Sequence, residues 1–193
     1  KMPTFCMCRN IKGESVFNLY TNEILGAYLA TKHLIDIGHK KIGYMSGPLD
    51  VSFSQMRLEG FMKAINEAGF TQDQYHITES NYCYYSGTEK AKECLALGCD
   101  ALFAANDMMA IGAYQSIAEA GFTIGKDVSI VGFDDIRFAS MLVPSLSTVH
   151  QPMKSMAEEG VSALIDDVEG IVTTPFEKEY NPHLVIRNST RKG

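Results

Sequence analysis

The sequence predicts an α/β protein built on a doubly wound, mostly parallel sheet, and three observations support that class. Short apolar runs without polar alternation recur along the chain, as is typical of strands that are covered on both faces. Stretches with apolar residues at helical spacing alternate with these runs. Glycines stand where left-handed helix caps are expected, at Gly38, Gly69, Gly98 and Gly121. This order of features indicates a repeated unit of strand, helix and strand.

The clearest such unit lies in the middle of the chain. The apolar run 101–105 predicts a strand that ends at Asn106, a residue type that commonly caps helices. Apolar spacing then predicts a helix over 107–120, and a second apolar run predicts a buried strand over 129–133. Because ligands bind at the carboxyl edge of doubly wound sheets, we expect Asn106 and Asp134 to face one crevice.

The remaining elements follow the same pattern. Extended segments are predicted over 2–9, 41–45, 75–78 and 177–188, helices are predicted to end near Ile37, Ala68 and Leu97, and a further helix is predicted over 153–168. The sequence SGTE at 86–89 has the form of a capping box, which predicts that a helix begins there.

The two ends of the chain do not fit this repeat and indicate a second lobe. We expect a partial amino-terminal lobe over 1–21, a carboxyl-terminal lobe over 22–149, a return to the first lobe over 150–172, and a final strand of the second lobe over 173–193. The return segment and the first residues are too few to build a second sheet with its own core. The chain is therefore expected to be the carboxyl part of a longer protein.

Composition argues against several classes of protein. The chain contains 17 Lys and Arg residues and 23 Asp and Glu residues, which gives a formal net charge of −6. Phosphate binding relies on clustered basic residues. A large nucleic-acid surface on this chain is therefore not expected. No apolar run is long enough to span a bilayer, and the amino terminus lacks the apolar region of a signal peptide. These features predict a cytoplasmic protein without a membrane partner.

The cysteines predict reduced thiols. There are five of them, an odd number, without the spacing of secreted disulfide domains. Cys6 and Cys8 bracket one residue of a predicted strand, which would place both on one face and would suit a metal site. No second ligand pair lies nearby in the sequence, so neither a metal nor a cofactor is expected.

A set of motifs occurs in a fixed order along nearly the whole chain. They are GHKKI (38–42), GPL (47–49) with Arg57 and Gly60, ANDMMAIGA (105–113), VSIVGFDD (128–135), PSLSTV (144–149), HQP (150–152) and RNST (187–190). In this order they resemble the effector-binding core of the lac and gal repressor family of bacterial transcription regulators. The resemblance implies a type I periplasmic-binding-protein-like fold, here with one lobe nearly complete and the other partial.

The resemblance also implies a mechanism and partners. Two lobes close on a small effector, and the change in the angle between lobes across a homodimer repositions two helix-turn-helix heads on operator DNA. This chain carries no such head, so operator DNA would be contacted only through a part outside it. The effector is expected to be a carbohydrate.

The resemblance places Arg57, Asn106 and Asp134 in the ligand site. A guanidinium can donate several hydrogen bonds to vicinal hydroxyls, although Arg57 would otherwise be a surface residue of an amphipathic helix. Asp134 would accept hydrogen bonds from sugar hydroxyls, with a plain helix cap as the alternative. Asn106 offers a donor and an acceptor and can also cap the following helix. Asp135 is expected to be structural.

Three further positions complete the expected ligand site. Tyr82 falls where family members stack an aromatic ring on the effector, in a tyrosine-rich run that also supplies core residues. Gln151, at a crossover between lobes, either reaches the ligand or acts as a linker. Val51 and Phe53 stand where purine-binding members carry arginine and threonine, which favours a sugar or polyol over a purine. At Thr21, many members carry an aspartate.

Apolar residues also occur where family members dimerise. These are Ile111, Tyr114, Met141, Leu142 and Val143. Burial in the core is the alternative for each of them. The run from Met141 to Val143 favours an interface most, because it falls outside the predicted helices and strands.

The leading hypothesis is therefore the effector-binding core of a dimeric repressor, without catalysis. A transport-type sugar receptor of the same fold is the alternative, because fold alone does not separate the two. The missing signal peptide argues against it. An enzyme would use Asp107, Asp134 and Asp135 as a magnesium site, but neither a nucleophile nor a glycine-rich phosphate loop accompanies them.

Overall fold

The structure is a computed structural model that describes residues 3–8, 11–13, 16–171 and 176–190. Its helices and strands, in chain order, are β1 (Thr4–Met7), β2 (Val16–Thr21), α1 (Glu23–Asp36), β3 (Ile42–Ser46), α2 (Ser52–Glu67), η1 (Gln72–Gln74), β4 (Tyr75–Glu79), α3 (Tyr84–Ala96), β5 (Ala101–Ala104), α4 (Asp107–Glu119), β6 (Ser129–Asp134), η2 (Arg137–Met141), β7 (Ser147–His150), α5 (Met153–Val168), β8 (Glu177–Tyr180) and β9 (His183–Val185). In the described part of the chain, no helix combines the length and apolar character needed to cross a membrane.

The chain forms two compact units: Lys1–Asn22 with Gln151–Pro182, and Glu23–His150 with His183–Gly193.

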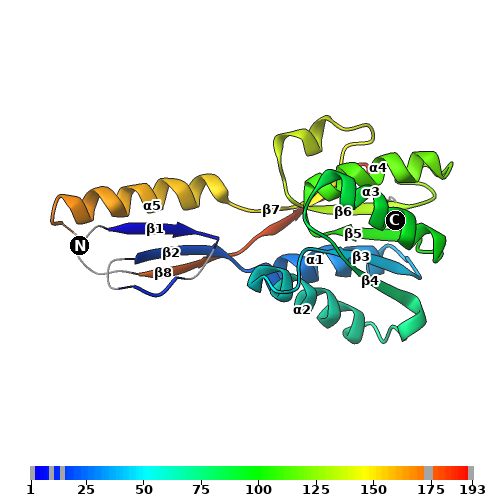
Figure 1. Ribbon diagram of the computed structural model, residues 1–193, viewed down its shortest axis with the longest axis horizontal. Helices are drawn as coiled ribbons and strands as arrows, with labels where there is room; N and C mark the ends of the chain where they lie inside the picture. The colour runs from blue at the N-terminus through cyan, green and yellow to red at the C-terminus, as the bar shows by residue number, and fades with distance from the viewer. Residues whose placement is uncertain (1–2, 9–10, 14–15, 172–175, 191–193) are drawn as a thin grey trace. The chain divides into compact units, whose positions relative to one another are not determined.

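The larger unit contains a six-stranded sheet in the order β4-β3-β5-β6-β7-β9. The first five strands are parallel, and β9 pairs antiparallel with β7 at the edge. Helices α1 and α2 cover one face, and α3 and α4 cover the other (Figure 1). The predicted class, a doubly wound and mostly parallel sheet, is confirmed. All residues of β3 and β5 are buried, as continuous apolar runs indicate.

Stacked aromatic rings form the centre of this unit's core. The Tyr44 ring of β3 lies between Phe61 of α2 and Phe103 of β5, with centroid separations of 4.8 and 5.0 Å. All three side chains are fully buried. Burial of each contributes about 2–3 kcal/mol relative to exposure, and ring pairs add about 1 kcal/mol. The stack therefore joins the central strands to the covering helix.

Helices α3 and α4 pack backbone against backbone. A Cβ atom at Gly112 would overlap the carbonyl oxygen of Tyr84, and one at Gly87 would overlap that of Met109. The Thr88 hydroxyl donates to the Gly112 carbonyl oxygen at 3.1 Å across this contact. The two glycines therefore set the distance between the helices. Tyr82 and Asn106 lie just before the amino-terminal ends of α3 and α4, respectively.

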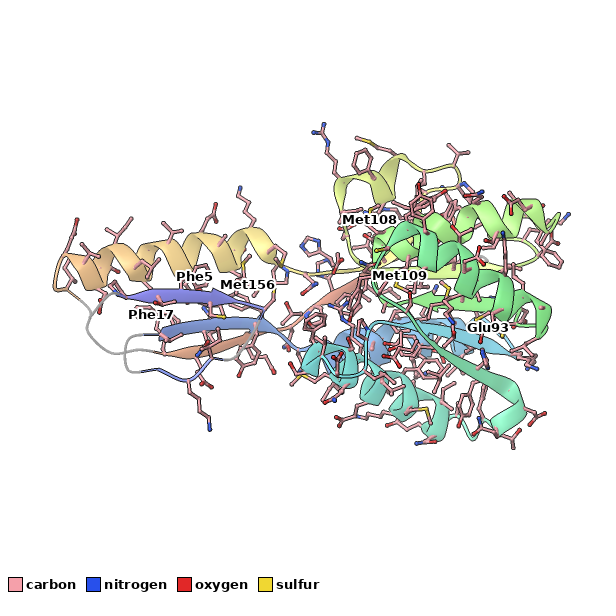
Figure 2. The ribbon with its side chains drawn as sticks, in the orientation of Figure 1. Phe5, Phe17, Glu93, Met108, Met109 and Met156 are labelled. Atoms are coloured by element: carbon pink, nitrogen blue, oxygen red, sulfur yellow. The ribbon has the colours of Figure 1, made fainter. Side chains whose placement is uncertain are left out.

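The smaller unit is a three-stranded parallel sheet, β1-β2-β8, with α5 on one face (Figure 1). Its core contains Phe17, Leu19, Met156 and Ala163, and the Phe5 ring packs against α5 (Figure 2). The expectation that these segments cannot build a sheet with a core is wrong. The reason is that β8 supplies a third strand from a part of the chain that we assigned to the other lobe.

The predicted final segment 173–193 is divided between the two units. Residues Glu177–Tyr180 pair with β2, and only His183–Val185 pair with β7 of the larger sheet. Pro182 lies between the two pairings, and its missing N–H prevents one continuous ladder. Residues 173–175, at the start of the predicted segment, lie outside the described residues, as do Met2 and Arg9 of the predicted first strand.

Two local predictions are wrong for identifiable reasons. Helix α3 begins at Tyr84 with Cys83 as its cap, so Ser86 lies inside the helix. The Ser86 hydroxyl donates to the Cys83 carbonyl oxygen at 2.9 Å instead of capping. Strand β1 ends at Met7, and Cys8 has a φ of 65°. The Cys8 thiol therefore reaches Met153 on α5 (3.7 Å) and does not share a strand face with Cys6.

Gly112→Ala should destabilise the protein by roughly 1–3 kcal/mol, because the added methyl group forces α3 and α4 apart. The measurement is the urea midpoint of unfolding, with Ala118→Gln at an exposed position of α4 as control. A Gly112→Ala midpoint equal to that of the control would contradict the close packing of the two helices.

Candidate functional site

The candidate site lies at the carboxyl edge of the larger sheet. We call Phe53, Arg57, Tyr82, Asn106 and Asp134 the carboxyl-edge site. Asp134 is the last residue of β6, Asn106 follows β5, and Tyr82 precedes α3. The other two lie in the first turns of α2, which follows β3. Each side chain thus comes from the end of a strand or the start of the following helix, as the topology predicts.

Arg57 is the buried centre of this site, with 4% of its surface exposed. Its Nε donates to Oε2 of Glu23 at 2.7 Å, and Nη1 donates to the Ala105 carbonyl oxygen. Nη2 lies 3.9 Å from Oδ1 of Asp134. The guanidinium also lies over the Phe133 ring, 3.8 Å from its centroid. Arg57 is therefore not a surface arginine, and its position at the strand ends is held by several contacts.

The charges around Arg57 keep it protonated. Burial by itself lowers the pKa of this guanidinium, and the carboxylates of Glu23 and Asp134 outweigh that effect, so the pKa of Arg57 is raised. A buried arginine paired in this way is fixed in orientation, because leaving either partner would leave a charge in a poorly solvated place. The site therefore holds its cation in place without a ligand.

Two aromatic rings lie beside the arginine. The Phe53 and Tyr82 rings are 5.6 Å apart between centroids, and the Arg57 guanidinium lies 5.5 Å from the Phe53 centroid. The Tyr82 hydroxyl lies 2.6 Å from Oγ of Ser54, a buried residue of α2. The structure thus places Phe53 and Tyr82 next to Arg57, and they can provide an apolar surface for a ring-shaped ligand.

Asn106 has the capping role that its residue type predicts. Its Oδ1 accepts a hydrogen bond from the Met109 N–H at 2.8 Å at the start of α4. Its Nδ2 donates to the Tyr82 carbonyl oxygen at 3.1 Å. Tyr82 has a φ of 65°, a backbone conformation that a non-glycine residue adopts only when neighbours hold it. Asn106 therefore positions Tyr82, while its contact with a ligand remains a prediction.

The turn after β6 is also held in a strained conformation. Asp134 and Asp135 have φ values of 113° and 56°. The carboxyl group of Asp107 holds this turn, because its Oδ2 accepts from the Ile136 N–H at 2.8 Å and its Oδ1 accepts from the Thr148 hydroxyl at 2.6 Å. Sequence reasoning missed this role and considered Asp107 as a possible metal ligand. Strain of this kind clusters at functional sites.

Asp135 has a structural role, as expected. Its carboxylate pairs with Nη2 of Arg187 at 2.6 Å and with Nδ1 of His150 at 2.9 Å. Burial alone would raise the pKa of Asp135, and these two partners outweigh it, so the pKa is lowered. Asp135 and Asp107 are thus engaged by protein groups. Within the described ranges, no three His, Cys, Asp or Glu side chains are arranged to hold a metal ion.

The remaining predicted residues are Gln151 and those of the expected dimer interface. Gln151 is buried and belongs to the smaller unit. Val143 and Met141 are 93% and 57% exposed, whereas Leu142 packs partly against the core. Tyr114 is half-buried, and its hydroxyl donates to the Pro144 carbonyl oxygen at 2.9 Å. Ile111, like Tyr114, is only partly exposed on α4.

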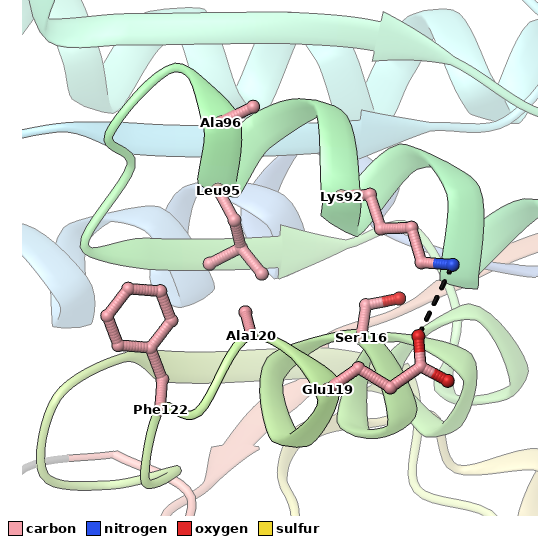
Figure 3. Close-up of a pocket in the computed structure, with 7 residues that line it drawn as sticks. All are labelled: Lys92, Leu95, Ala96, Ser116, Glu119, Ala120 and Phe122. Carbon is pink, nitrogen blue, oxygen red and sulfur yellow. Dashed lines mark ion pairs between the residues drawn. The ribbon is translucent and has the colours of Figure 1, made fainter.

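A groove of about 390 Å³ lies between α3 and α4 but away from the carboxyl-edge site. It is lined by Lys92, Leu95, Ala96, Ser116, Glu119, Ala120 and Phe122 (Figure 3). Lys92 and Glu119 form an ion pair of 3.3 Å at one end of it. Because these residues lie toward the carboxyl ends of both helices, the groove is near the amino ends of β5 and β6. The sequence did not predict it.

The fold and site agree with a known family. Residues 31–190 match the family described as "Periplasmic binding protein-like domain". The chain belongs to this family, as part of the effector-binding core found in lac and gal repressor-type regulators. The ribose operon repressor of Escherichia coli K12 is 34% identical over 171 residues, which are 87% of this chain and 52% of that protein. The repressor PurR of Photobacterium profundum is 36% identical over 168 residues, 86% of this chain and 50% of that protein.

Solved structures give the same result. A LacI family transcriptional regulator from Enterococcus faecium with bound ribose has a TM-score of 0.89 and 28% identity, covering 98% of this chain and 70% of that one. The Escherichia coli repressor ascG has a TM-score of 0.84 and 29% identity, with 96% and 68% covered. These relatives are transcriptional regulators and not enzymes. The chain spans about half the length of the curated relatives that it matches.

The buried carboxyl of Asp107 should make stability depend on pH. Burial raises its pKa to about 7, so the folded protein keeps a proton that the unfolded chain releases near pH 4. Its contribution to the free energy of unfolding should therefore fall as pH rises from about 4 to about 7, by about 4 kcal/mol. In Asp107→Asn the amide oxygen can accept from the Ile136 N–H and the amide nitrogen can donate to the Thr148 hydroxyl oxygen, so this variant should remove the loss.

The measurement is the urea midpoint of unfolding from pH 4 to pH 8, compared with Asp50→Asn at an exposed position. The difference between Asp107→Asn and the unsubstituted protein should grow in favour of the variant as pH rises. Parallel pH profiles for the two proteins would contradict the raised pKa.

Proposed function

We propose that this chain is the effector-binding core of a bacterial transcriptional regulator and that a small sugar binds at the carboxyl-edge site. The observation that carries the proposal is the buried Arg57, held between Glu23 and Asp134 beside the rings of Phe53 and Tyr82. Family membership and the regulator relatives support the regulatory role. The ribose operon repressor and the ribose-bound regulator make ribose the first sugar to test.

The chemistry of the site suits a polyol. A guanidinium donates to adjacent hydroxyl oxygens, and a carboxylate accepts from hydroxyl hydrogens, so Arg57 and Asp134 together satisfy groups that do both. An aromatic ring packs against the apolar C–H face of a sugar. Val51 and Phe53 offer no side-chain hydrogen bonds to read a purine. We therefore favour a sugar over a purine, although the relatives include PurR repressors.

The effector would act by shifting a conformational equilibrium. A ligand that prefers one arrangement of the lobes increases the population of that arrangement. In our proposal Gln151, after β7, adds a contact to the sugar. Operator DNA would be bound by a helix-turn-helix head outside these residues, since the chain has a formal net charge of −6. A DNA-bound regulator of this kind acts in the cytoplasm.

We further propose that the chain forms a homodimer through the segment after β6. Phe138, Met141 and Val143 are 63%, 57% and 93% exposed, although all three are apolar. Neighbouring exposed apolar residues of this kind mark interaction surfaces more often than isolated ones do. Ile111, Tyr114 and Leu142 are partly buried, so they would contribute less than we expected from the sequence.

Substitution of Arg57 should abolish sugar binding. A thermal-shift screen of monosaccharides, disaccharides, sugar phosphates and purines on the complete gene product should identify a stabilising sugar. At a concentration of 100 times Kd, the stabilisation is about 2.7 kcal/mol. Arg57→Ala should lose it. Arg57→Lys, which keeps the charge but not the planar fork, should lose most of it.

Folding of both variants is checked by far-UV circular dichroism before the screen. An undiminished shift in both folded variants would exclude Arg57 from the site. A folded protein that no sugar in the screen stabilises would contradict the proposed ligand class.

Val143→Asp should convert dimers to monomers, because a carboxylate at the centre of an apolar interface would be desolvated without a partner. The measurement is molar mass by light scattering after size exclusion. Leu97→Asp, an exposed apolar position at the far end of α3, is the control and should remain dimeric. A dimer that persists in Val143→Asp would place the interface elsewhere.

A further inference from the structure

We propose that Glu23 determines which sugars the carboxyl-edge site accepts, by giving the surroundings of Arg57 a net negative charge that favours neutral sugars and disfavours sugar phosphates. This inference rests on the proposed function, since it concerns the ligand class of the same site. Glu23 is absent from the predicted ligand set. Its carboxylate would distinguish neutral sugars from sugar phosphates, which a buried arginine alone would not distinguish.

Glu23 is built into the site by its place in the fold. It is the first residue of α1, and 5% of its surface is exposed. Its Oε2 accepts from Nε of Arg57 at 2.7 Å, so the two side chains form a buried, hydrogen-bonded ion pair. A carboxylate in the first turn of a helix is also stabilised by the helix dipole. Glu23 thus belongs to the same charge cluster as Asp134.

The charges of this cluster do not cancel. One guanidinium faces the carboxylates of Glu23 and Asp134, which leaves one negative charge. An arginine without Glu23 would be a good partner for phosphate, because its fork matches phosphate oxygens. With Glu23 on the Nε edge, a phosphate that approaches Arg57 also approaches two carboxylates. At separations of about 6–8 Å in a partly buried site, one such repulsion changes affinity on the order of tenfold or more.

Two features of the same edge act in the opposite direction. Helices α2 and α3 begin there, and neither has a side chain that caps its first turn. Helix amino termini without a side-chain cap attract anions. By contrast, Asn106 caps α4, and Asp107 places a carboxyl at its first turn. Neutral sugars carry no net charge and bind through hydrogen bonds and ring contacts, so they need no favourable electrostatic field.

The test compares a neutral sugar with its phosphate on variants that differ by one charge. Binding of D-ribose and D-ribose 5-phosphate to the complete gene product is measured by titration calorimetry. The same is done for Glu23→Gln, whose amide oxygen can still accept from Nε of Arg57. Glu59→Gln is the matched control, because Glu59 is exposed on α2 two residues from Arg57. If the thermal-shift screen identifies another neutral sugar, that sugar and its phosphate replace ribose.

We expect the unsubstituted protein to bind the neutral sugar at least about tenfold more tightly than the phosphate. Glu23→Gln should change the ratio of the two affinities by about tenfold in favour of the phosphate, and Glu59→Gln should leave it unchanged. A merely structural role of Glu23 would weaken both ligands together and would not move this ratio.

Other outcomes would overturn the inference in distinguishable ways. Tighter binding of the phosphate by the unsubstituted protein would mean that the helix amino termini outweigh the carboxylates. A ratio unchanged in Glu23→Gln, or changed equally in Glu59→Gln, would remove Glu23 from ligand selection while the sugar-binding function stands. Failure of every neutral sugar and every phosphate to bind any of the folded proteins would instead overturn the proposed function, and this inference with it.

Discussion

The carboxyl group of Asp107 is the constraint on which the geometry of the carboxyl edge depends. It is fully buried at the start of α4 and accepts hydrogen bonds from the turn after β6 and from Thr148 of β7. Gly132 of β6 makes room for it, because a Cβ there would overlap its Oδ1. Three segments that are distant in sequence are therefore joined through one side chain. These bonds hold the turn in which Asp134 has a φ of 113°.

Arg57 is held with similar firmness on the other side of the site. Its partners come from α1, the end of β5 and the end of β6, so its guanidinium is oriented before any ligand arrives. Preorganisation of this kind lowers the cost of ordering a site on binding. The pairing of Arg57 with Glu23 and Asp134 also explains why its buried charge is tolerated. Without these carboxylates, the guanidinium would be an unpaired charge in a poorly solvated place.

The two units differ in how they obtain their cores. The larger unit has buried strands covered on both faces, with a stack of Tyr44, Phe61 and Phe103 at its centre. The smaller unit draws its sheet from two separate parts of the chain, β1 and β2 from one and β8 from the other, with α5 on one face. A sheet assembled in this way needs long-range pairings before any apolar surface is buried, and such pairings are costly in chain entropy.

The sequence by itself determined the class of fold, most of the strands and helices of the larger unit, and the place of Asn106 and Asp134 at the carboxyl edge. These features follow from periodicity and capping among residues adjacent in the chain, whereas Phe53, Arg57 and Tyr82 were expected there from the resemblance to the repressor family. Only the tertiary structure decided that Glu23 pairs with Arg57 and that Asp107 holds the turn at Asp134. It also assigned Glu177–Tyr180 to the smaller sheet. An acidic residue in the first turn of a helix is an ordinary local feature, and its partner 34 residues away is selected by packing that no local pattern records.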